Sequence, residues 1–109
     1  MAFANFGAGT HRDLVLDKTA DVLCILCVHI VGADSTSGAL RWYNFSDSVA
    51  GESTGTFDFT TGTSTADHYN LVCFGYFADV AAGTKWFFPQ YDGLVGTIQE
   101  VTYYAFALY

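Results

Sequence analysis

Seven short runs of apolar, β-branched and aromatic residues recur along this chain, and clusters of Gly, Ser, Thr, Asn and Asp separate them. Such runs between turn-forming clusters are typical of β-strands. Helical patterns are nearly absent, and only residues 79–82 favour a single helical turn. Seven strands without intervening helices favour a sandwich or barrel over an α/β fold. We therefore predict an all-β fold, a single antiparallel β-sandwich of jelly-roll-like or Greek-key type, with strands at residues 14–16, 22–31, 40–45, 56–60, 69–77, 85–88 and 97–108.

The length of 109 residues suits one domain of this kind. We divide it into an N-terminal arm, residues 1–13, and a β-sandwich domain, residues 14–109. The arm carries Phe3 and Phe6 among small and polar residues. This pattern is compatible both with an arm that crosses to a neighbouring subunit and with a segment folded back over its own sheet.

Two predicted strands are apolar on both faces, because alternate residues of a strand point to opposite sides. In residues 22–31 both alternating sets are apolar except for His29. A two-layer sandwich covers one face of each sheet, so we expect a loop, the N-terminal segment or a neighbouring subunit to cover the other face. Residues 103–109 are also uncharged, and we expect them to form an interior strand near a subunit interface. Residues 56–60 instead alternate, which predicts Phe57 and Phe59 inward and Asp58 outward.

Charged residues make up 14% of the chain, against about 25% in an ordinary soluble domain, while hydrophobic residues make up 51%. Uncharged polar residues or another protein chain must therefore cover much of the surface. The net charge is −7 and the four cationic residues are scattered singly, which argues against nucleic acid and anionic membranes as partners. The N-terminus lacks the pattern of a secretion signal, and the longest apolar run is too short for a membrane-spanning helix.

The three cysteines do not form a recognisable metal or redox motif. Cys24 and Cys27 have C-x-x-C spacing, but within a strand residues three apart face opposite ways. We expect all three thiols, including Cys73, to be buried and unreactive. Cys27 and His29 share one strand face, yet aliphatic neighbours leave such a thiol inactive. We therefore predict no enzyme activity, no catalytic or metal-binding residues and no cofactor.

Aromatic residues are the remaining feature with functional content. Most are expected in the core, and some at a protein interface, where large amphipathic rings are enriched. A second hypothesis is a carbohydrate-binding module in which Trp42, Tyr43, Trp86 and Tyr91 stack on sugar rings. The candidate interface residues are Phe3, Phe6, Trp42, Tyr43, Trp86, Phe87, Tyr91, Tyr104, Phe106 and Tyr109.

The sparse charge, the aromatic N-terminal segment 2–7 and the apolar final run 103–109 together resemble small virion proteins of tailed phages. The likeness is greatest to capsid decoration, or cement, proteins, which are rich in β-structure and bind between capsomers. The closing run is also similar to the last strand of tumour-necrosis-factor-like jelly rolls, which associate as trimers. These resemblances imply a structural protein of the virion, assembled in the host cytoplasm, that forms a homo-oligomer, preferentially a trimer, or docks on a capsid.

Overall fold

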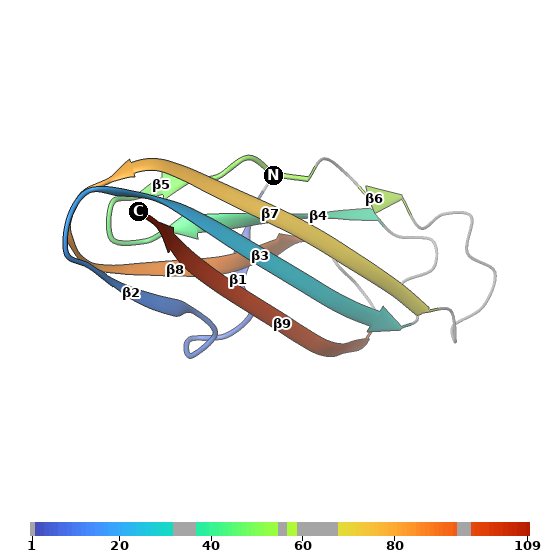
Figure 1. The fold of residues 1–109 in the computed structure, drawn as a ribbon. Helices are drawn as coiled ribbons and strands as arrows, with labels where there is room; N and C mark the ends of the chain where they lie inside the picture. Colours follow the sequence, from blue (N-terminus) through green and yellow to red (C-terminus); the bar gives the residue numbers. More distant parts are fainter. Residues whose placement is uncertain (1, 32–36, 55–56, 59–67, 94–96) are drawn as a thin grey trace.

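The computed structural model describes residues 2–31, 37–54, 57–58, 68–93 and 97–109, and it shows two antiparallel sheets packed face to face (Figure 1). No helix occurs in these residues. The smaller sheet has the order β7-β3-β9, and the larger one is built around β8 and β4. The strands are β1 (Ala4–Asn5), β2 (Arg12–Leu16), β3 (Ala20–Val31), β4 (Ser37–Asn44), β5 (Val49–Ala50), β6 (Phe57–Asp58), β7 (His68–Val80), β8 (Gly83–Asp92) and β9 (Thr97–Leu108).

The chain passes repeatedly from one sheet to the other. Strands β2, β4 and β8 belong to the larger sheet, and β3, β7 and β9, which alternate with them along the chain, form the smaller one. All pairings are antiparallel. Two facing antiparallel sheets joined in this way form a β-sandwich, and they confirm the predicted all-β fold class.

All seven predicted strands are present. The last one has the predicted bounds, residues 97–108, whereas β2, β3, β4, β7 and β8 have shifted ends. β8 exceeds its predicted range, residues 85–88, by more than any other strand, because it continues through Pro89 to Asp92. The helical turn expected at residues 79–82 is wrong. There β7 continues to Val80, and Asp79 has a positive φ of 53° at an irregularity where Ala20 pairs with Val80 and Val22 with Phe77. Strand β6 falls within the predicted run 56–60, but the orientation of Phe57 and Phe59 lies outside the described side chains.

The N-terminal segment folds back on its own sheet, which resolves the two alternatives. Strand β1 pairs with β8 at Tyr91 and Gln90, and β2 pairs with β8 from Phe87 to Gly83. The segment is thus part of the larger sheet, and the boundary expected after residue 13 falls inside β2.

The core lies between the sheets, as the period of two requires. One alternating set of β3 is completely buried and packs against Trp42 of β4 and Phe87 of β8. Gly75 on β7 allows an unusually close approach, because a Cβ atom there would lie 2.7 Å from the Cβ atom of Trp42. The buried set of β3 consists of Val22, Cys24, Leu26, Val28 and Ile30.

One expectation about strand order is wrong. Within the described part of the chain, β9 is an edge strand of the smaller sheet that pairs with β3 alone, whereas the interior position belongs to β3. Arg12 of β2 partly protects the free edge of β9. Its Nε donates to the carbonyl oxygen of Tyr103 at 3.0 Å, and its guanidinium lies over the Tyr103 ring.

Among the described residues there is no helix of the length and apolar character that crossing a membrane requires.

Candidate functional site

The outward side of the smaller sheet carries a continuous apolar surface. Residues paired across an antiparallel sheet lie side by side on the same face. Leu23 of β3 is paired with Tyr76 of β7 and Phe106 of β9, and the next outward residue, Ile25, is paired with Phe74 and Tyr104. We call this surface the apolar face and define it by Leu23, Ile25, Val72, Phe74, Tyr76, Tyr104, Phe106 and Leu108.

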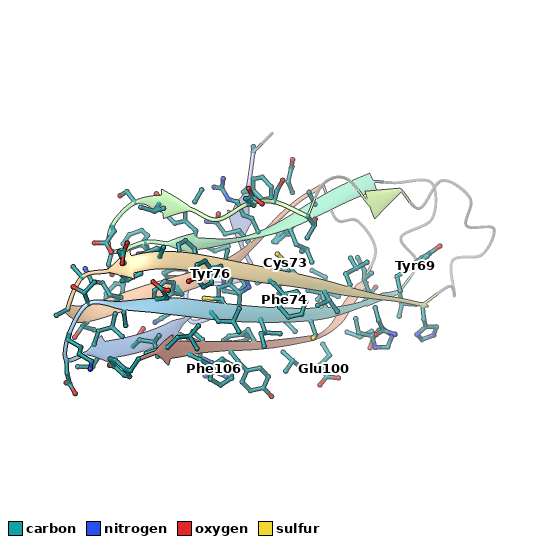
Figure 2. All side chains as sticks on the ribbon, turned by 45° about the horizontal axis from the view of Figure 1, so that its top comes forward. Tyr69, Cys73, Phe74, Tyr76, Glu100 and Phe106 are labelled. Atoms are coloured by element: carbon teal, nitrogen blue, oxygen red, sulfur yellow. The ribbon has the colours of Figure 1, made fainter. Side chains whose placement is uncertain are left out.

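Large side chains on the apolar face are about half exposed. Phe74 is 64% and Tyr76 57% exposed, and Tyr104, Phe106, Leu108 and Val72 are exposed to a similar but smaller degree. Figure 2 shows Phe74 and Tyr76 on β7 and Phe106 on β9, the two strands that flank β3. The rings of Tyr104 and Phe106 stack with centroids 6.2 Å apart. From the usual area of aromatic side chains, the exposed apolar patch is on the order of 600 Å², at the upper end of the range found for the largest patch on a monomer.

The second face of β3 was expected to be covered, and the described part of the chain does not cover it. The N-terminal segment, one of the expected covers, belongs to the larger sheet instead. Leu23 and Ile25 are half-buried only because longer side chains on β7 and β9 flank them. The sequence therefore identified a strand with two apolar faces correctly, and the structure leaves one of them open.

Charged groups lie at the ends of the apolar face. Asp21 and Asp79 mark one end, and Glu100, opposite His29, marks the other. The four cationic side chains are engaged elsewhere. Arg12 contacts Tyr103, Lys18 lies over the Tyr109 ring, Arg41 donates to Gln90, and Lys85 pairs with Asp47. The middle of the apolar face is thus uncharged.

Asp21 stabilises the irregular C-terminal end of β7 through two hydrogen bonds. Its carboxylate accepts hydrogen bonds from the Tyr76 hydroxyl and from the Asp79 backbone N–H, the latter at 2.9 Å. The Tyr76 hydrogen bond, followed by that of Asp79, lowers the pKa of Asp21 below its usual 3.8. Both bonds hold the backbone where Asp79 has its positive φ.

We expect Asp21→Asn to destabilise the protein at neutral pH, because the amide that replaces the carboxylate is a weaker acceptor for these two donors. The folded-state pKa is lowered, so the contribution of Asp21 is present above about 3.8 and is lost as the pH falls through the folded-state value. The difference between wild type and variant should therefore shrink below pH 3.8. Urea unfolding from pH 7 to pH 2 measures this, with exposed Asp17→Asn as control. A difference that stays constant over this range would contradict the role assigned to Asp21.

The three thiols lie in two different environments. Cys24 and Cys73 are buried, as expected, and burial raises the pKa of Cys73 to about 11 and that of Cys24 further still. Cys27 was expected to be buried as well, but it is exposed, on the outward side of β3 between Val72 and Thr102. The C-x-x-C residues thus face opposite ways, as predicted.

The ten sequence-predicted interface residues do not form one surface. Tyr104 and Phe106 lie on the apolar face, and Tyr109 is exposed beyond its end. Trp42 and Phe87 must be removed from the set, because both are completely buried in the core. The remaining five lie elsewhere: Phe3 under the Arg41 guanidinium, Phe6 against the Tyr91 ring, and Tyr43 and Trp86 on the larger sheet.

Sequence reasoning missed the contribution of β7. Val72, Phe74 and Tyr76 alternate with the buried Leu71, Cys73 and Phe77. Residues 69–77 therefore show the same signal, two apolar sets in one strand, that marked residues 22–31. Applying the period of two to this run would have found them.

The outward side of the larger sheet is chemically different. Arg41 donates to Gln90 at 2.7 Å, and Gln90 donates to Asn5 at 2.8 Å. Trp86 stacks on Phe45 nearby. The four residues of the carbohydrate hypothesis are not brought together, since Trp42 is in the core and Tyr91 packs against it.

Comparison of the chain with protein-family models, with curated proteins and with solved structures gave no match. Function is therefore inferred from the chemistry of the domain itself.

Proposed function

We propose that this protein is a structural assembly protein whose copies associate through the apolar face. The observation that carries the proposal is the pair of cross-strand rows, Tyr76–Leu23–Phe106 and Phe74–Ile25–Tyr104, with half-exposed aromatic rings on both flanking strands. Removing such a surface from water is favourable by roughly 25 cal/mol per Å². The work of the protein is then burial of apolar area, without chemical turnover.

A second copy of the chain is the occupant that fits this surface. A standard interface buries about 800 Å² per partner, and the apolar patch with its polar rim approaches that area. Two sheet faces pack well against each other at about 10 Å, as they do inside a sandwich. The net charge of −7 opposes association, but the acidic residues of the apolar face lie at its ends, where they stay solvated.

The resemblance to capsid decoration proteins makes a viral shell the larger assembly in this proposal. A decoration protein adds its own interface to contacts between capsomers, and an oligomer does so at several points at once. The expected native source is then a particle of megadalton mass. Isolation of the protein as a free 11.8 kDa species from its native source would contradict the virion part of the proposal.

The self-association is tested by light scattering coupled to size exclusion, at micromolar concentration and with EDTA present. We expect a mass of twice 11.8 kDa, because two identical faces packed against each other close as a dimer. Dilution should shift the mass towards one chain. A single-chain mass at every concentration up to about 100 μM, which corresponds to a Kd weaker than that value, would overturn the proposal.

Chemical labelling of Cys27 tests independently which surface is buried in the oligomer. It is the exposed thiol on the outward side of β3, next to the Phe74–Ile25–Tyr104 row, whereas Cys24 and Cys73 are buried in the core. We expect a maleimide to label Cys27 slowly in the oligomer and at least tenfold faster in dilute monomer. Labelling that is equally fast at all concentrations would place the interface elsewhere.

A further inference from the structure

The apolar face ends in two histidines from neighbouring strands. His29 is on β3 and His68 begins β7, and each belongs to the outward set of its strand. His68 is paired with Val31 and His29 with Asn70, so the two histidines are diagonal neighbours, within reach of each other. The two rings are hydrogen-bonded to each other: Nε2 of His29 lies 2.8 Å from Nδ1 of His68, and one of these nitrogens carries the proton that the other accepts. The same two nitrogens therefore face each other at one point of the surface.

Convergent imidazole nitrogens are the usual ligands of Zn²⁺, Ni²⁺ and Cu²⁺. With Zn–N bonds of about 2.0–2.1 Å at the tetrahedral angle, two nitrogens on one zinc ion are about 3.4 Å apart. To admit the ion, the pair has to give up its hydrogen bond, move the bridging proton to the other nitrogen of the same ring, and open by roughly half an ångström. Rotation of two side chains that are not in the core supplies such a change.

The surroundings of the pair favour a cation. A hollow of about 300 Å³ adjoins His29, and Cys27, Asn70, Glu100 and Thr102 are among the residues that line it. Glu100 is opposite His29 in the pairing register and adds negative charge. The cationic side chains of the described residues are engaged elsewhere.

One chain supplies only part of a metal site. Among the described residues of one chain, no three His, Cys, Asp or Glu side chains are grouped to hold a metal ion. We propose that His29 and His68 form a half-site for a divalent transition-metal ion such as Zn²⁺, and that the same pair from a second copy completes a four-nitrogen site. This inference rests on the proposed association through the apolar face. It requires a two-fold axis along β3, so that the histidine ends of the two copies meet.

The test is Zn²⁺ titration by calorimetry at pH 7.5. We expect one ion per two chains for the wild-type protein. His29→Ala and His68→Ala should each weaken binding at least tenfold. His11→Ala is the matched control, because His11 lies on the larger sheet beside Asp13, and its zinc binding should equal that of wild type. Absence of zinc binding, or binding that survives in both the His29 and His68 variants, overturns the inference.

The molecular mass with and without zinc separates this inference from the proposed function. EDTA removes free zinc, so an oligomer that forms in EDTA is held by the apolar face without metal. Such an oligomer supports the proposed function whether or not added zinc strengthens it. Zinc should then lower the dissociation constant of the wild-type oligomer at least tenfold and leave the dissociation constant of His68→Ala unchanged. An oligomer whose affinity does not respond to zinc overturns the metal inference only. A protein that is monomeric in EDTA and dimeric with zinc overturns apolar self-association and supports the metal site.

Discussion

Phe74→Glu is expected to convert the oligomer into single chains of 11.8 kDa at concentrations where the wild type is assembled. Phe74 is the most exposed of the large side chains on the apolar face, at 64%, and it lies beside Ile25 in the row nearest Cys27. A glutamate there must lose its hydration when two faces meet, at a cost of several kcal/mol unless it is paired. Each copy in a symmetric interface carries the change, so we expect association to weaken at least 100-fold.

The same exposure makes Phe74→Glu a mild change for the isolated domain. A side chain that is mostly in solvent contributes little to the core, and β-propensity differences amount to about 1 kcal/mol at most. Urea unfolding of the dilute variant should therefore differ by about 1 kcal/mol or less from dilute wild type. Val15→Glu is the matched control, because Val15 is 71% exposed on β2 of the other sheet. Its mass should equal that of the wild type.

Sedimentation velocity over a concentration series measures both variants. Rapid maleimide labelling of Cys27 should accompany the loss of mass in Phe74→Glu and be absent in Val15→Glu. An assembled Phe74→Glu protein, or an equal loss of mass in the Val15 control, would show that the apolar face is not the interface.

Local sequence pattern predicted the strands well because their period of two is a local property. The buried set of β3, from Val22 to Ile30, follows directly from alternation, and so does the opposite orientation of Cys24 and Cys27. The ends were less predictable. Proline ends many strands, yet Pro89 is accommodated in β8, opposite Trp42 of β4.

Strand order was not predictable from local pattern, and this explains the error about β9. β3 pairs with β7 and β9, which follow it by about 50 and 80 residues along the chain. The sequence of residues 97–108 does not indicate which distant strand it pairs with, or whether a strand lies on one side of it or on both. An apolar edge strand and an apolar interior strand have the same sequence pattern. The difference here lies in Arg12, which partly protects the edge of β9 from another sheet.

The candidate site was also predictable only in the parts that depend on local sequence. Tyr104 and Phe106 were identified from one run, but their partners Ile25 and Leu23 became neighbours only through the pairing register. His29 and His68 are 39 positions apart and have no spacing typical of a metal motif. Trp42 and Phe87 were misassigned because an aromatic residue in a strand carries no local mark of the face it occupies, and aromatic residues adjoin both, Tyr43 after Trp42 and Trp86 and Phe88 on either side of Phe87.

Trp42→Ala is expected to lower the free energy of unfolding by about 3–5 kcal/mol, a large fraction of the 5–15 kcal/mol typical of a small domain. Trp42 is completely buried between the sheets, and its removal leaves a cavity that strands on both sides cannot fill. Its Nε1–H has no hydrogen-bond partner among the described residues, so losing that buried donor offsets part of the loss. Trp86→Ala, at a 42% exposed position, should cost about 1 kcal/mol or less. Urea unfolding at one low protein concentration compares the two, because association would add stability. Equal losses would contradict the core position of Trp42.

A double-mutant cycle with Gly75 separates loss of packing at Trp42 from general damage to the sheet. A Cβ atom on Gly75 would lie 2.7 Å from the Trp42 Cβ, so Gly75→Ala should cost roughly 1–3 kcal/mol in the wild-type background. In the Trp42→Ala background the nearest ring atoms are gone, although the Cβ atom remains, and the strands gain room to adjust. The cost should fall by at least about 1 kcal/mol, the coupling expected of residues in direct contact. Additive losses would show that β7 and β4 do not meet through this contact. Gly9→Ala, with no atom within 4 Å of the added Cβ, should be additive with Trp42→Ala and shows the size of an uncoupled effect.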